Sequence, residues 1–254
     1  MSAPSVEDNG HLVFKFADFL EEIRAMRDLA PSFLTAEGLH VLRDFHGEVN
    51  SFAGAKNVRR GWIVIPQDRP VRTRSSKGYK PQQEGGMNLF ATLSGSWEIS
   101  KFDATDKKRT GMFRTIGLAS WVVTLRLEKD PTVVVARWNF DLGLKGAPGC
   151  FFHAQFEPTK ILSNGESSDL DVPRLFSLLV TPMDALAFVL GEIFQDEWAR
   201  TAENSLLQPV RTFRTRQLGR MNRLFTWLLQ RMEHGEGIPL ANLKGAMPHD
   251  LELF

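Results

Sequence analysis

The spacing of apolar side chains predicts two helices near the start of the chain. Over residues 12–29 and 35–49, apolar positions recur every three or four residues, with charged positions largely between them. This period places the apolar side chains on one side of a helix. Ser32 or Thr35 is suited to cap the second helix, because a hydroxyl oxygen can accept from the first free amides. We therefore expect a pair of amphipathic helices here.

The middle of the chain has a different pattern, rich in β-branched and aromatic residues with partial alternation of apolar and polar positions. KDP at 129–131 is a short connection of the kind that joins a hairpin. The pattern predicts an antiparallel meander of about four to five strands, with a further short strand possible at 62–65. The predicted strand runs are 88–100, 116–128, 132–142 and 150–156.

Two further helices are expected after the strands. Thr181 followed by Pro182 predicts a helix start, because proline suits the first helical position. Pro209 opens a last helix that HGEG at 234–237 ends. Helices at both ends of the chain with strands between them predict an α+β fold, since parallel βαβ units would alternate the two. We expect one domain over 1–254, with a helical part (12–49), a basic irregular segment (50–86), the meander (87–160), a helical layer (181–233) and a tail (234–254).

Composition adds limits on function. The 254 residues carry a formal charge of +1 and one cysteine, Cys150, which predicts no internal disulfide and fits a reducing compartment. We find no signal peptide and no apolar run long enough to span a bilayer, so a soluble cytoplasmic protein without membrane contacts is expected. The phosphate-loop, dinucleotide-binding, HExxH, GxSxG and CxxC motifs are absent. No cofactor is predicted.

Charge is concentrated in the segment 56–80, where eight Lys or Arg residues accompany one acid, Asp68. Such a stretch can bind a polyanion, and aromatic side chains within it can stack on bases. A solvated loop explains the same composition. The candidate nucleic-acid ligands here are Arg59, Arg60, Arg72, Arg74, Lys77, Tyr79 and Lys80.

The last predicted helix carries a second cationic feature. Four arginines and one tryptophan, spaced by three or four residues, fall in one narrow sector. Guanidinium groups suit bidentate phosphate contacts and an indole can stack on a base. Alternatively, acids of the preceding helix, such as Asp184 and Glu192, could pair with this stripe, either inside one molecule or across a dimer. The stripe, called the Arg/Trp stripe below, consists of Arg216, Arg220, Arg223, Trp227 and Arg231.

His153 is the strongest catalytic candidate. Alternation places it with Gln155 on one sheet face, and Arg137 and Asp141 share a face of the preceding strand. If the strands pair so that these four side chains meet in a cleft, His153 could act as an acid or base in hydrolysis. The alternative is a buried histidine with a hydrogen-bonding partner.

A row of potential metal ligands lies on the helix predicted at 35–49. Glu37, His40, Asp44 and Glu48 follow helical spacing, and histidine with carboxylates can bind divalent metals. The row also lies opposite the apolar side, where any surface helix is polar. We therefore predict no metal site.

Together these features favour a binding module that engages nucleic acid or another polyanion through the segment 56–80 and the Arg/Trp stripe. A hydrolytic enzyme centred on His153 is one alternative. The other is a protein–protein adaptor or oligomeric scaffold, in which the stripe binds an acidic protein and the tail GAMPHDLELF (245–254) provides a docking peptide or a contact in a homo-oligomer.

Overall fold

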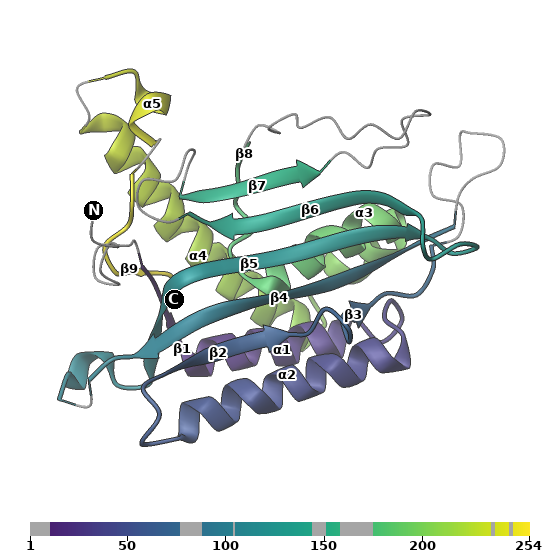
Figure 1. Ribbon diagram of the computed structural model, residues 1–254, viewed down its shortest axis with the longest axis horizontal. Coiled ribbons are helices and arrows are strands. Elements are labelled where there is room, and N and C mark those ends of the chain that lie inside the picture. The colour runs from purple at the N-terminus through teal and green to yellow at the C-terminus, as the bar shows by residue number, and fades with distance from the viewer. Residues whose placement is uncertain are drawn as a thin grey trace.

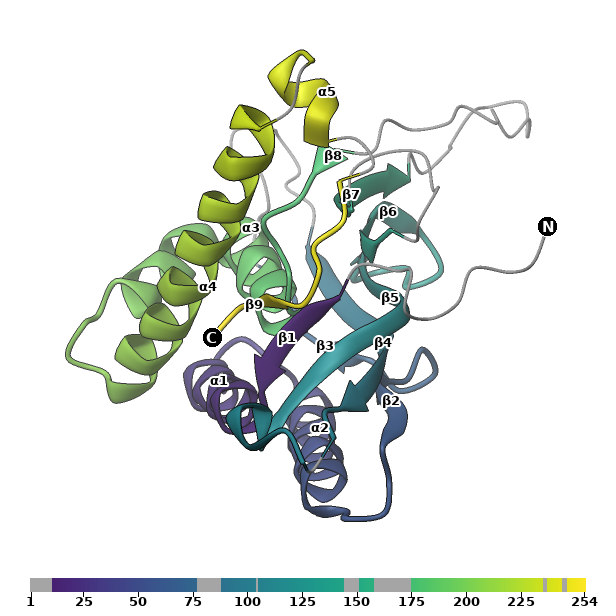
Figure 2. The same cartoon turned by 90° about the vertical axis from the view of Figure 1, so that its left-hand side faces the viewer.

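The protein is a curled sheet of mostly antiparallel strands with helices packed against one of its faces (Figures 1 and 2). The computed structural model describes residues 11–76, 88–103, 105–143, 151–157, 175–234, 237–243 and 246–254. The main strand order is β2-β4-β5-β6-β7-β8, while β3 pairs with β4, and β1 pairs with β5 and β9. The strands are β1 (Leu12–Lys15), β2 (Arg60–Ile65), β3 (Val71–Arg72), β4 (Leu89–Lys101), β5 (Met112–Leu127), β6 (Val134–Leu142), β7 (Phe152–Glu157), β8 (Leu175–Phe176) and β9 (Leu251–Glu252).

The predicted mixture of helices and antiparallel strands is confirmed. Strands β4, β5, β6 and β7 pair consecutively and antiparallel, as the alternation over 88–156 predicted. The predicted number of strands was too small, because nine strands occur in the described residues. Several of the others have only two to four residues, which is too short for alternation to reveal.

Residues 12–15 form a strand and not the first turn of a helix, so the predicted helix over 12–29 began too early. Leu12, Val13 and Phe14 are all buried, which suits a strand inside a sheet. The helix α1 begins at Phe16. Parallel pairing with β9 brings residues 251–252 beside β1, so the tail packs on its own chain: the Leu253 amide donates to the Val13 carbonyl at 2.9 Å, and Leu253 is buried.

The helix starts follow from local chemistry. The Thr35 hydroxyl accepts from the Gly38 amide at 3.0 Å, which caps α2. Thr181 and Asp184 form a capping box at the start of α3, where each side chain accepts from the other's backbone amide. The helices are α1 (Phe16–Leu29), α2 (Ala36–Gly54), α3 (Pro182–Ala202), α4 (Gln208–Glu233) and α5 (Pro239–Leu243), with a short 3-10 turn η2 at Lys107–Arg109.

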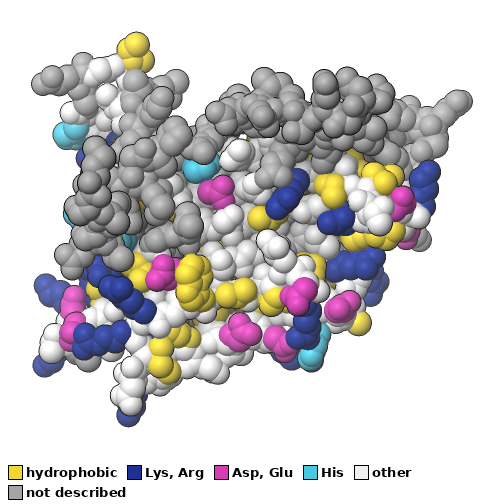
Figure 3. Space-filling model, viewed as in Figure 1, with side chains coloured by type: hydrophobic (Ala, Val, Ile, Leu, Met, Phe, Trp, Pro, Cys, Tyr) yellow, Lys and Arg dark blue, Asp and Glu magenta, His cyan; other side chains and the backbone are white. Residues whose placement is uncertain are grey.

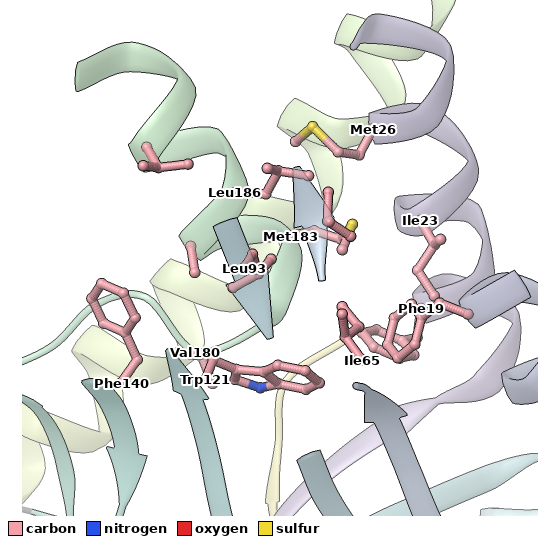
Figure 4. Close-up of a cluster of buried hydrophobic side chains, with 14 of the residues drawn as sticks. Phe19, Ile23, Met26, Ile65, Leu93, Trp121, Phe140, Val180, Met183 and Leu186 are labelled. Carbon is pink, nitrogen blue, oxygen red and sulfur yellow. The ribbon is translucent and has the colours of Figure 1, made fainter. Parts of the chain in front are cut away.

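The hydrophobic core lies between the sheet and the helices. Trp97 of β4 and Trp121 of β5 are fully buried, with ring centroids 5.6 Å apart. Figure 4 shows Trp121 with Phe19 of α1 to its right and Met183 of α3 above it. This packing fixes α1, α3 and the sheet relative to one another. No described helix is long and apolar enough to cross a membrane.

Candidate functional site

The Arg/Trp stripe lies along helix α4, and its first and second halves have different surroundings. Its inward side buries Val210, Phe213, Leu224 and Leu228, and with them Arg220, which is 3% exposed. The remaining members of the stripe follow the edge of this buried side. Their positions relative to α1 and to the C-terminal residues decide which of them can reach a ligand.

Arg220 is enclosed by two carboxylates. Its guanidinium donates to both Glu22 oxygens at 2.8 and 2.9 Å, and to both Asp184 oxygens at 2.7 and 3.1 Å. Burial alone would lower the pKa of Arg220, but Asp184 and Glu22 raise it above its ordinary value. Burial raises the pKa of Glu22, against the opposing effect of Arg220. This cluster joins α1, α3 and α4, and it holds Arg220 away from solvent.

Arg216 is also paired, although it is less buried. Its guanidinium lies 2.9 Å from Asp18 and 2.6 Å from Glu21, both on α1. Ion pairing inside the fold therefore accounts for Arg216 and Arg220, the first half of the stripe. Asp184 was among the expected partners, whereas the α1 acids were not. Glu22 could have been noticed, because it lies three residues after Phe19 and four before Met26, within the apolar sector of α1.

The second half of the stripe lines a pocket. Arg223, Trp227 and Arg231 face the C-terminal residues 249–252 across a cavity of about 440 Å³. The Arg231 guanidinium lies 5.8 Å from the centroid of the Trp227 ring, and the Arg223 guanidinium lies 5.4 Å from the centroid of the Phe254 ring. Trp227 packs edge-on against Phe152 of β7 at 6.2 Å, which holds the indole in place.

The acids on the opposite wall of this pocket already have cationic partners. Arg109 lies 2.7 Å from Asp250 and 3.8 Å from Glu252, and Arg114 lies 3.8 Å from Asp250. Arg223 and Arg231 make no ion pair with the residues that the structure describes. The pocket therefore combines two guanidinium groups with an aromatic ring, while its acids are largely neutralised from the sheet side.

The described cations of the segment 56–80 lie elsewhere. Arg59 pairs with Asp103 at 2.9 Å, Arg60 is exposed on β2, and Arg72 covers the Phe90 ring at 4.0 Å. Arg74 donates to the Leu34 carbonyl. Strands β2 and β3 lie near one edge of the sheet, beside α2, whereas α4 packs on α1 and reaches β7 (Figures 1 and 2). The two basic segments therefore do not form one surface, as far as they are described; Lys77, Tyr79 and Lys80 lie outside the described residues.

On the sheet face turned away from the helices, β7 places His153 opposite Asp141 of β6. His153 Nε2 lies 3.7 Å from Asp141 Oδ2, and His153 is 6% exposed. In the strand register Gln155 lies opposite Asn139 and Glu157 lies opposite Arg137, so Arg137 is four residue pairs along the ladder from His153. The proposed pairing of His153 with Asp141 is therefore present, while Arg137 is not beside them.

The order of side chains across the sheet limits the chemistry of this face. Ser120 of β5 pairs with Asp141, which in turn pairs with His153. The Asp141 carboxylate thus lies between the Ser120 hydroxyl and the His153 imidazole. The strands of Ser120 and His153 are two strand spacings apart, or about 10 Å. A serine nucleophile needs the imidazole within hydrogen-bonding reach. This row of residues does not provide a Ser-His-Asp triad.

Two residues of the polar row on α2, His40 and Asp44, take part in surface ion contacts. His40 Nε2 lies 3.8 Å from Asp44, and Asp44 lies 2.9 Å from Arg69. Within the part of the chain that the structure describes, no group of three or more His, Cys, Asp or Glu side chains is arranged to hold a metal ion. Figure 3, which views the sheet face, shows dark-blue and magenta side chains intermixed along the lower rim.

Comparison with protein-family models, curated proteins and solved structures gave no match to this chain.

Proposed function

We propose that the protein binds single-stranded nucleic acid through the pocket between α4 and residues 249–252. The observation that carries this proposal is the position of Arg223, Trp227 and Arg231 on one wall of a cavity of about 440 Å³. The binding surface is smaller than the sequence suggested, because Arg216 and Arg220 are engaged with acids of the fold.

The chemistry of these three side chains supports a ligand with both phosphates and aromatic rings. They are spaced by four residues, so about 12 Å of helix separates Arg223 from Arg231, with the indole between them. Guanidinium groups bind phosphate oxygens bidentately, and stacking of a base on an aromatic side chain contributes about 1–3 kcal/mol. Duplex DNA does not offer an unstacked base, which is why we propose a single strand.

Fluorescence anisotropy with a labelled single-stranded oligonucleotide, repeated across a salt series, tests the proposal. We expect Arg223→Glu to weaken binding by about tenfold or more at low salt and to reduce the salt dependence, because one phosphate contact is lost. Trp227→Ala should weaken binding with little effect on the salt dependence. Arg60→Glu is the matched control, since it reverses one exposed arginine on β2.

Three results would contradict the proposal: no binding at low salt, equal weakening by Arg60→Glu and Arg223→Glu, or equal affinity for duplex and single strand. Binding that depends on Arg60 but not on Arg223 would instead support the segment 56–80, which stays a separate prediction.

The hydrolytic alternative depends on the contact between His153 and Asp141. A carboxylate beside an imidazole can fix its tautomer and support a general base. Its test is a screen for hydrolysis of ester and phosphoester substrates, in which His153→Asn must abolish any activity found. Activity that survives this substitution would exclude His153 as the base.

A further inference from the structure

The solvent-facing side of α4 carries three large hydrophobic side chains. Leu218, Phe225 and Leu229 are 46%, 44% and 53% exposed, and Leu206, just before the helix, is 85% exposed. Of the ten large hydrophobic side chains that are exposed in the described residues, six lie between residues 206 and 238. Single exposed leucines are ordinary, but a grouping of this kind marks an interaction surface.

Leu218, Phe225 and Leu229 share one side of α4, because they are spaced by seven and four residues. They span about 16 Å of helix. Arg211 and Arg214 lie on the same side at the beginning of the helix, and residues 208–232 contain six arginines and no acid. This surface, the α4 stripe, is therefore apolar with a cationic end.

Helix α3 carries the opposite charge. Glu192, Asp196 and Glu197 are exposed on it and Glu203 is exposed directly after its end, with one exposed cation, Arg200. These four acids form no ion pair with described residues, because the arginines of α4 that pair within the fold use α1 and Asp184 instead. One molecule thus presents an unpaired acidic surface and an apolar, cationic one on consecutive helices.

We infer that a second copy of this chain covers the α4 stripe, in a two-fold symmetric dimer in which α4 of each protomer lies against α3 of its partner. Both helices lie on the side of the sheet turned away from the viewer in Figure 1, so one contact face can include both. A two-fold axis repeats the contact, because the surface that supplies α4 also supplies α3.

The alternative of pairing α4 with α4 is less favourable electrostatically. Two of the six arginines on α4, Arg216 and Arg220, are paired inside the fold, so this arrangement would bring the other four beside their copies on an identical helix, without the acids of α3 between them. Pairing with α3 matches Arg211 and Arg214 to acids while it removes Leu218, Phe225 and Leu229 from water.

The first test is the solution mass, measured by light scattering during size-exclusion chromatography over a wide range of protein concentration. We expect a dimer that Leu218→Ser with Phe225→Ser weakens by about a hundredfold, because exposed side chains at the centre of an interface contribute most. Trp62→Ser is the control, since Trp62 is 55% exposed on β2. A monomer at every concentration, or a dimer weakened equally by Trp62→Ser, would overturn the inference.

The second test uses charge reversal to identify the pairing of helices. One variant carries Arg211→Glu and Arg214→Glu, and the other carries Asp196→Lys and Glu197→Lys. Each alone brings like charges together at both contacts, so each should be monomeric. An equimolar mixture restores opposite charges at both contacts and should form a heterodimer.

Folding of both variants is checked by circular dichroism. Two folded variants that stay monomeric when mixed would refute the pairing of α3 with α4. Binding of a monomeric wild-type protein to vesicles of anionic lipid, or to an acidic helical peptide, through the α4 stripe would also refute self-association, because a different partner would then cover it.

Discussion

Replacing Arg220 by methionine should be one of the most destabilising single changes in this protein. The substitution keeps an unbranched side chain about as long as the arginine stem, but it leaves the carboxylates of Glu22 and Asp184 without their shared cation. The three side chains are 4%, 2% and 1% exposed, so water scarcely screens the two carboxylates from each other. Removal of one partner from a buried ion cluster costs about 3–5 kcal/mol. We expect a loss of that size in the free energy of unfolding at neutral pH.

A triple variant separates the charge effect from lost packing. Glu22→Gln and Asp184→Asn, combined with Arg220→Met, remove all charges from the cluster and keep the oxygens that accept from Thr181 and from the α3 start. Because no buried charge then lacks a partner, the triple variant should lose less stability than Arg220→Met alone. This order of stabilities is the main result expected.

The assay is urea unfolding, followed by tryptophan fluorescence, at about pH 7 and about pH 5. Burial already raises the pKa of Glu22 above its ordinary value of 4.5, and loss of Arg220 should raise it further. The folded state then binds more protons than the unfolded state, so the stability that protonation provides is lost as pH rises through the folded pKa. The deficit of Arg220→Met should therefore be smaller at the lower pH.

The triple variant has no ionisable group in the cluster and should lack this pH dependence. A loss below about 1 kcal/mol for Arg220→Met would refute the reasoning, because an exposed ion pair contributes no more than that. Equal losses in the single and triple variants, or a deficit independent of pH, would refute it as well.

Two further predictions concern the sheet and its histidine. Gly95 has φ +150°, and a Cβ there would clash with the Ser120 carbonyl oxygen, so Gly95→Ala should lower the unfolding free energy by at least about 2 kcal/mol. At Gly47, on an exposed part of α2, a Cβ would meet nothing within 4 Å, so Gly47→Ala should raise the unfolding free energy by about 0.5–1 kcal/mol. Equal effects of the two substitutions in urea unfolding would contradict this. Burial lowers the pKa of His11 below its ordinary value of 6.5, so the unfolded state gains protons first and stability should fall as pH drops through 6.5. His11→Gln should make the free energy of unfolding depend less steeply on pH in this range. An unchanged dependence would mean that other groups cause it.

Sequence reasoning succeeded where a structural element depends on neighbouring residues. The caps at Thr35 and Thr181 follow from a hydroxyl placed before a helical run, and the strands β4 to β7 follow from alternation within each strand. It failed at β1, because four residues cannot establish a period and the apolar pattern of the adjoining helix continued across them. The pairing of β1 with β5 decides its structure, and that contact joins residues about a hundred positions apart.

The candidate site likewise combines features that depend on neighbouring residues with features that depend on distant contacts. Spacing along α4 identified the residues of the Arg/Trp stripe, but not which side of the helix would be buried. That depended on Glu22, which bonds Arg220 across 198 positions of sequence. Likewise, alternation predicted which residues share a sheet face with His153 on β7 and with Asp141 on β6. Whether the two lie opposite each other depends on the register between β6 and β7, and a shift of one residue would turn one of them to the other face.

The pairing of β1 with β9 has a consequence for synthesis of the chain. These strands belong to opposite ends of the described residues, yet their parallel pairing leaves β1 between β5 and β9. Until residues 251–252 are made, the edge of β1 that faces β9 has no partner, and unpaired edges of apolar strands invite association with other chains. Residues 251–252 therefore cover this edge of β1, and a chain truncated before Leu251 would expose it.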